Sequence, residues 1–284
     1  MQLERMFEVT LIARGHRPLK VTGPGHVLLS RALPILDATE NLIVAVRELS
    51  TKQVPQLRLG CVDSLLASIG PRLFRSLLDK VQRLTVTSGT TGVQSRGLLN
   101  REIDICLSSD PLDESEGVSR LPILTEPFVL LLPASMGQRA DVPVDIGQLV
   151  ERLPLVRFNP ASHMGAMADL HLRRLGLRPP RGIEVDSSEA LTAMVASEIG
   201  WAITTPLCLL EVRVERRPIQ VLPFPGPGFS RTLYVLAREN EFAELPEAVA
   251  NAASNALRQV CLPRLLEYAP WAERSIRIPE GEPS

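Results

Sequence analysis

Short apolar runs typical of strands alternate with helical periodicity from residue 57 onwards, and this alternation restricts the fold more than any other feature of the sequence. In the first unit, the predicted strands and helices follow one another at 57–62, 65–79, 84–87, 90–100 and 103–107. An apolar run at 127–132 is predicted as a further strand. Strands that alternate with helices form parallel sheets with right-handed crossovers. The sequence therefore predicts an α/β fold.

A second unit with the same alternation follows the first. Its predicted elements are strands at 155–158, 183–185, 201–204 and 219–222 and helices at 163–175 and 188–198. The chain then returns with a strand at 232–237 and a helix around 245–260. We therefore expect two lobes, the first formed by 56–133 and completed by 231–268, and the second formed by 134–230.

A long helix is predicted over 22–50, ahead of these lobes. Thr22 can cap this helix, and Pro24 lies in its first turn, where a missing N–H group has little effect. An apolar seam with heptad spacing runs along it, through Leu28, Ala32, Ile35, Thr39, Leu42, Val46 and Leu49. Such a seam pairs with a second helix, so residues 24–50 are predicted to dimerise through Leu28, Ile35, Leu42, Val46 and Leu49. The alternative is a helix that packs on its own domain. Pro34 should kink or split the helix.

Residues 1–23 have the pattern of the end of a small domain. A short helical face is followed by two extended runs around a Gly/Pro turn, which predicts a hairpin. The local basic cluster of the chain lies there and comprises Arg14, His16, Arg17 and Lys20. It either contacts nucleic acid phosphates or is a solvated turn.

The order of these segments resembles the LysR-type transcription regulators over nearly the whole chain. Near the N-terminus the resemblance rests on Leu3-Glu4 and on the stretches at 11–14, 17–20 and 21–25. In the later part it rests on 57–62, Pro-Arg-Leu-Phe at 71–74, 98–105 and the stretch from Met194 to Pro206. No single motif is specific, but their order over some 260 residues is.

The resemblance implies a two-lobed effector domain of the type 2 periplasmic-binding-protein kind, with a small-molecule effector in the cleft. It also implies a winged helix-turn-helix before the linker helix, of which residues 1–23 would be a remnant with the wing and the end of the recognition helix. Two positions depart from the family pattern: Ile12 replaces the usual phenylalanine, and Arg101 replaces a glycine after Asn100. The helix that precedes Arg101 must therefore end at Asn100 or end in a backbone geometry that does not need glycine.

Small polar residues follow several predicted strands, where open α/β sheets bind ligands and where helix N-termini favour anions. The predicted effector-binding residues are Ser64, Ser88, Gly89, Thr90, Asn159, Ser162, His163, Ser187, Ser188 and Thr204. Each hydroxyl could instead be only a helix cap. His163 could bind a carboxylate or face solvent, and Arg157 could anchor a ligand, although a surface position is favoured.

Composition and motifs exclude several other classes of protein. Formal net charge is −1, so DNA affinity requires a local patch. The N-terminus lacks signal-peptide features, and no apolar stretch reaches the roughly 18 residues that a membrane span needs. The cysteines Cys61, Cys106, Cys208 and Cys261 lack metal-ligand spacing and are predicted to be buried thiols, with a redox switch as the minor alternative. His163 and His171 lack a third ligand, so we expect no metal, and no cofactor.

The sequence thus predicts a cytoplasmic, homodimeric or homotetrameric transcription regulator that responds to a small-molecule effector and, in the context of the whole family, binds DNA. DNA binding by this chain is doubtful because most of the recognition helix would precede Met1. The alternative is a stand-alone sensor or an interfering partner without specific DNA binding. An enzyme is not expected, because no nucleophile elbow, Walker-type loop or paired carboxylates occur. Residues 269–284 are predicted to form a loose tail.

Overall fold

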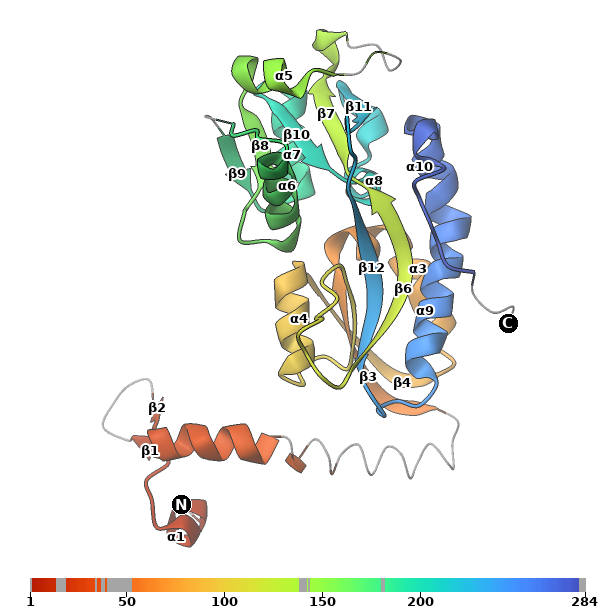
Figure 1. The fold of residues 1–284 in the computed structure, drawn as a ribbon. Helices are drawn as coiled ribbons and strands as arrows, with labels where there is room; N and C mark the ends of the chain where they lie inside the picture. Colours follow the sequence, from red (N-terminus) through yellow and green to blue (C-terminus); the bar gives the residue numbers. More distant parts are fainter. Residues whose placement is uncertain are drawn as a thin grey trace. The chain divides into compact units, whose positions relative to one another are not determined.

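The computed structural model describes residues 2–13, 19–33, 35–36, 39, 53–137, 142, 144–179 and 182–280. The chain divides into two compact units, Met1–Pro55 and Gln56–Ser284, and each is described by itself (Figure 1).

The first unit begins with the helix α1 (Gln2–Phe7) and a small hairpin of β1 (Ile12–Ala13) and β2 (Lys20–Val21). The two strands are antiparallel, as the sequence predicts. Helical residues start at 23, and the Thr22 hydroxyl accepts a hydrogen bond from the Gly25 N–H group at 3.2 Å, which confirms the predicted cap.

The predicted dimerisation seam is only partly covered by the described residues. Residues 23–33, 35–36 and 39 are helical. Leu28 is half-buried and Ile35 is exposed. Pro34, Leu42, Val46 and Leu49 lie outside the described residues, as do Arg14, His16 and Arg17 of the basic cluster.

The first sheet of the second unit has the strand order β4-β3-β5-β12-β6. Its strands are β3 (Val54–Val62), β4 (Val81–Gly89), β5 (Ile105–Ser108), β6 (Val118–Pro127) and β12 (Ser230–Arg238). The strands β3 and β5 are parallel, whereas β12 returns antiparallel to β5 and β6. The helices of this lobe are α3 (Asp63–Leu77), α4 (Thr91–Leu99) and α9 (Leu245–Ala256). The leucines and isoleucines of β3 and β5 are fully buried and form its core together with Leu65, Ile69, Leu73 and Leu77 of α3.

The second sheet has the order β11-β7-β10-β8-β9. Its strands are β7 (Val129–Pro133), β8 (Leu155–Phe158), β9 (Gly182–Val185), β10 (Trp201–Thr204) and β11 (Ile219–Pro223). The strand β8 is parallel to β9 and β10, and β7 is antiparallel to β10 and β11. The helices here are α5 (Ile146–Arg152), α6 (His163–Arg174), α7 (Ser188–Ala196) and α8 (Pro206–Glu211), and the short turns are η1 (Ala134–Met136) and η2 (Val214–Arg216). The predicted two-lobed α/β fold is confirmed.

Two neighbouring crossings join the lobes. The chain passes from β6 to β7 at Phe128 and returns from β11 to β12 past Phe229 (Figure 1). The Phe128 N–H group donates to the Phe229 carbonyl at 2.9 Å, and the two rings stack with centroids 4.1 Å apart. The prediction that 129–133 belongs to the first lobe is therefore wrong, because β7 pairs in the second sheet. The apolar run at 127–132 contains no turn signal that marks this change of sheet.

The C-terminal segment packs on the rest of the second unit, and the prediction of a loose tail from residue 269 is wrong for the described residues. The chain continues from α9 through η3 (Leu257–Cys261), α10 (Leu262–Tyr268) and η4 (Pro270–Ala272). Ala269 and Ala272 are fully buried. Further along, the main chain of Arg277 exchanges two hydrogen bonds with Thr125, so the segment extends the edge of β6.

Candidate functional site

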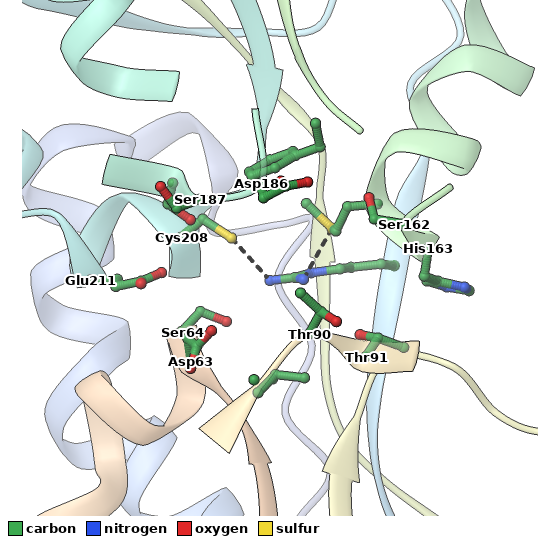
Figure 2. Close-up of a pocket in the computed structure, with 16 residues that line it drawn as sticks. Asp63, Ser64, Thr90, Thr91, Ser162, His163, Asp186, Ser187, Cys208 and Glu211 are labelled. Carbon is green, nitrogen blue, oxygen red and sulfur yellow. Dashed lines mark hydrogen bonds between the residues drawn. The ribbon is translucent and has the colours of Figure 1, made fainter. Parts of the chain in front are cut away.

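An open cavity lies between the two lobes of the second unit, where the N-termini of four helices converge (Figure 2). The first lobe contributes Val62, Asp63, Ser64, Gly89, Thr90, Thr91 and Arg231, and the second contributes Phe158, Ser162, His163, Met164, Asp186, Ser187, Ser188, Cys208 and Glu211. A ligand here would contact both lobes.

The four helices differ in how their first N–H groups are satisfied. Ser162 and Ser187 cap α6 and α7, since their hydroxyls accept hydrogen bonds from Gly165 and Ala190. The helices α3 and α4 of the first lobe have no side-chain cap. Unsatisfied N–H groups at a helix start, together with the helix dipole, favour an anion. The anion-binding capacity of the cavity is therefore concentrated in the first lobe.

Hydroxyl groups of the first lobe add to this capacity. No described residue forms a hydrogen bond with the hydroxyls of Ser64 and Thr90, and both line the cavity. Thr91 differs, because its hydroxyl is hydrogen-bonded to that of Ser109 at 3.0 Å. Ser64 and Thr90 can therefore donate to a ligand, whereas Ser162 already donates to the Asn159 carbonyl at 2.7 Å.

A buried ion pair forms one wall of the cavity. Arg231 of β12 and Glu126 of β6 are 4% and 0% exposed, and the Arg231 Nη2 atom lies 2.7 Å from Glu126 Oε1. The second carboxylate oxygen of Glu126 accepts from the Leu207 N–H group at 2.8 Å. Arg231 also contacts the sulfur atoms of Met164 and Cys208. Strands of the first lobe and α8 of the second are thereby joined, and the guanidinium charge is neutralised.

Three carboxylates line the cavity, namely Asp63, Asp186 and Glu211. Among the described residues, none of them forms a salt bridge. Burial raises the pKa of Glu211, and the negative charges of Asp63 and Glu189 raise it further, against the opposing effects of Ser188 and Arg231. The cavity thus contains more acidic than basic groups.

His163 lies at the first position of α6 and also faces an adjoining opening, which it shares with Thr90, Thr91, Ser162 and Asp186. Burial lowers the pKa of His163 despite the opposing effect of Asp110. The neutral ring can therefore donate or accept a hydrogen bond near neutral pH.

The structure brings together most of the predicted effector-binding residues, although no bound ligand tests their role. Seven of the ten predicted residues line the cavity, namely Ser64, Gly89, Thr90, Ser162, His163, Ser187 and Ser188. Asn159 lines only the adjoining opening, where its carboxamide oxygen accepts from the Ala161 N–H group. Ser88 is exposed outside the cavity, and Thr204 is buried without lining it.

Sequence reasoning missed the charged residues of the cavity. Asp63 and Asp186 directly precede predicted residues at strand ends, so the same rule could have found them. Arg231 and Glu126 carry no such signal, because only the pairing of β6 with β12 places them side by side. Cys208 and Glu211 lie on α8, a short helix that the sequence analysis does not predict.

Other predicted features have structural counterparts. All four cysteines are free and buried, as predicted, and burial raises the pKa of the Cys106 and Cys261 thiols to about 12. Arg157 forms ion pairs with Asp169 and Glu184 outside the cavity. Lys20 is exposed. The part of the chain that is described holds no cluster of metal-ligating side chains. Nor does it contain a helix with the length and hydropathy of a membrane span.

Comparisons with known proteins agree with this geometry. The HTH-type transcriptional regulator GltR of Bacillus subtilis is 27% identical over 205 residues, which cover 71% of this chain and 67% of GltR. Full-length OxyR from Pseudomonas aeruginosa has the same fold, with a TM-score of 0.68 at 19% identity over 92% of this chain and 83% of OxyR. The effector-binding domain of QuiR, solved in complex with shikimate, matches with a TM-score of 0.60 at 16% identity over 72% of this chain and 98% of that domain.

The family described as the LysR substrate binding domain matches residues 51–261, which include both lobes and every residue that lines the cavity. This match covers most of the chain, and the relatives are transcription regulators. The chain therefore belongs to the LysR family of transcriptional regulators.

Proposed function

We propose that the cavity between the lobes binds a small organic carboxylate and that this ligand controls transcription through the arrangement of the two lobes. The observation that carries the proposal is the uncapped start of α4, which faces the cavity beside the unpartnered hydroxyl of Thr90. Such a helix start binds anions through its N–H groups and its dipole. The QuiR domain, which is solved with shikimate, supports a small organic acid as the class of ligand.

The lobes give a route from the ligand to a response. A ligand that contacts Thr90 of one lobe and His163 of the other favours the arrangement in which both contacts are made. The difference in affinity between arrangements sets the size of the response. The crossings at Phe128 and Phe229 are the places where the chain must adjust.

We further propose that the chain assembles as a homodimer or homotetramer and acts in the cytoplasm. Large apolar side chains on the helical residues 23–33 and 35–36 are exposed within their own unit, among them Val27, Leu33, Ile35 and Leu36. A second copy of the same helix would cover them. We infer that specific DNA binding by the sequence as printed is weak, because the described residues before Gly23 form only a six-residue helix and a hairpin.

A screen of small carboxylates and aromatic acids by thermal shift tests the ligand class. We expect at least one acid to raise the melting temperature and the Thr90→Val variant to bind it about tenfold more weakly, because one hydrogen bond to a charged group is lost. Thr85→Val is the control, since Thr85 is exposed on β4 and does not line the cavity. Equal affinities of the two variants would contradict the proposed position of the carboxylate.

A further inference from the structure

The return crossing between the lobes is a short segment whose side chains cannot titrate. Residues 224–229 join β11 to β12 and read Phe-Pro-Gly-Pro-Gly-Phe. The chain bends at Gly226, which adopts the left-handed φ of 76° that glycine accepts without strain. The residues from Gly226 to Gly228 are exposed, whereas Phe224 at the start of the segment is buried. The segment is therefore a thin cover whose aromatic ends are anchored.

His171 of α6 lies under this cover. Its ring stacks on Phe229 with centroids 4.0 Å apart and an interplanar angle of 16°, and it meets Phe224 edge to face at 5.0 Å. Phe229 in turn stacks on Phe128 of the outgoing crossing at 4.1 Å. A single side chain of the second lobe thus contacts the return crossing directly and the outgoing crossing through Phe229.

The helix that carries His171 starts at the cavity. His163 is the first residue of α6 and lines the cavity, and Ser162 caps the helix beside it. His171 follows eight residues later, roughly two helical turns along. Because α6 is continuous between these residues, a shift at its cavity end reaches the crossings through the His171 ring.

The buried ring nitrogen of His171 has no place for a proton. Its Nε2 atom is buried and has no hydrogen-bond partner among the described residues, so a proton there would be a buried donor without an acceptor. Burial lowers the pKa of His171, the Pro227 carbonyl raises it, and the positive charge of Arg174 lowers it again. Residues 224–229 add no ionisable side chain, so His171 is the group that titrates in this contact.

We propose that His171 makes the return crossing a pH-sensitive hinge, in which uptake of a proton by the ring releases residues 224–229 from α6. The neutral ring keeps the contact above the ordinary pKa of 6.5. As the pH falls through that value, the protonated ring is stabilised by water, which it reaches when the exposed stretch from Gly226 to Gly228 opens. The lobes then lose a contact that fixes their arrangement. The inference needs no ligand, so its failure leaves the proposed function standing.

Amide hydrogen exchange, followed by NMR on the unliganded full chain, tests the inference. The reporter is the Phe128 N–H group, which donates to the Phe229 carbonyl at 2.9 Å and so joins the two crossings. We expect its protection, corrected for the intrinsic effect of pH on exchange, to fall severalfold from neutral to mildly acidic pH in the wild-type protein. The protection should stay constant in His171→Phe, because phenylalanine keeps a stacking ring and does not titrate. His171→Gln, which does not titrate either, gives the same comparison if the phenylalanine variant does not fold.

His26→Phe is the matched control, because His26 is exposed and belongs to the other compact unit. This variant should respond to pH like the wild-type protein. The amides of β5, in the core of the first lobe, report global unfolding and should stay protected at both pH values. The inference is overturned if the protection of Phe128 does not change with pH in the wild-type protein, or if it falls equally in His171→Phe. A fall that occurs only together with a fall in β5 would also overturn it, because the hinge would then not open by itself.

Discussion

At the scale of single residues, the Arg231–Glu126 pair holds the cavity wall together. We expect Glu126→Gln to lower the free energy of unfolding by about 3–5 kcal/mol, because the variant leaves the guanidinium of Arg231 as an uncompensated buried charge. Urea denaturation measures this change. The control is Glu184→Gln, because Glu184 is half-exposed in its ion pair with Arg157, and this variant should lose less than about 1 kcal/mol. Similar losses in the two variants would show that the buried ion pair contributes no more to the free energy of unfolding than the exposed one.

His171 should make stability dependent on pH. Its ring is 8% exposed and stacks on Phe229 with centroids 4.0 Å apart. Burial lowers the pKa of His171 below its ordinary value of 6.5, so the unfolded chain takes up the proton first as the pH falls. Stability from the neutral ring is therefore present above the unfolded pKa and is lost as the pH falls through 6.5 towards the lowered folded pKa.

The His171→Phe variant separates this effect from other titrations, because phenylalanine keeps a stacking ring and does not titrate. Chemical denaturation at neutral and at mildly acidic pH should show a smaller loss of stability in the variant than in the wild-type protein. The same loss in both proteins would mean that the pKa of His171 does not differ between the folded and unfolded states.

At the scale of secondary structure elements, the hydroxyl groups of the cavity are of two kinds: some cap a helix, and others form no cap bond and can contact a ligand. Ser187 accepts a hydrogen bond from the Ala190 N–H group at 3.2 Å, so Ser187→Ala should destabilise the protein by about 1 kcal/mol. Thr90→Ala should have a smaller effect on stability, since Thr90 forms no cap bond with α4. Thermal denaturation of both variants without ligand checks this difference. A larger loss for Thr90→Ala would assign a structural role to that hydroxyl.

Most elements could be predicted because their sequence periods are clear, and the exceptions have physical causes. The six residues of α8 contain a run of buried apolar side chains, so they show no amphipathic period. The break at Phe128 lies within a continuous apolar run. Arg101 adopts a left-handed backbone conformation with φ of 61°, which is usually found for glycine. Its side chain forms an ion pair with Glu241.

The candidate site was predictable only where sequence neighbours create it. Hydroxyl residues after strands mark helix starts, so Ser64 and Thr90 could be predicted from local pattern. Residues that meet across strands, such as Arg231 and Glu126, depend on a register that the sequence does not reveal. The charge of the cavity therefore became apparent only from the structure.

At the scale of the whole molecule, DNA binding should separate from ligand binding. A gel-shift assay of the chain as printed should show no preference for one DNA sequence over another, because the six residues of α1 are too few to serve as a recognition helix in the major groove. The assay includes a matched scrambled duplex as competitor. A specific shift at physiological salt would contradict this prediction and show that the residues present suffice to read bases.

Amide hydrogen exchange, measured with and without the carboxylate that binds most tightly, tests the central claim that the ligand lies between the two lobes. We predict slower exchange in the first turns of α3, α4, α6 and α7 and at the crossings near Phe128 and Phe229, since the ligand contacts both lobes. Unchanged exchange at these helix starts, with protection instead at the groove lined by Pro122, Leu262 and Ile278, would contradict the claim.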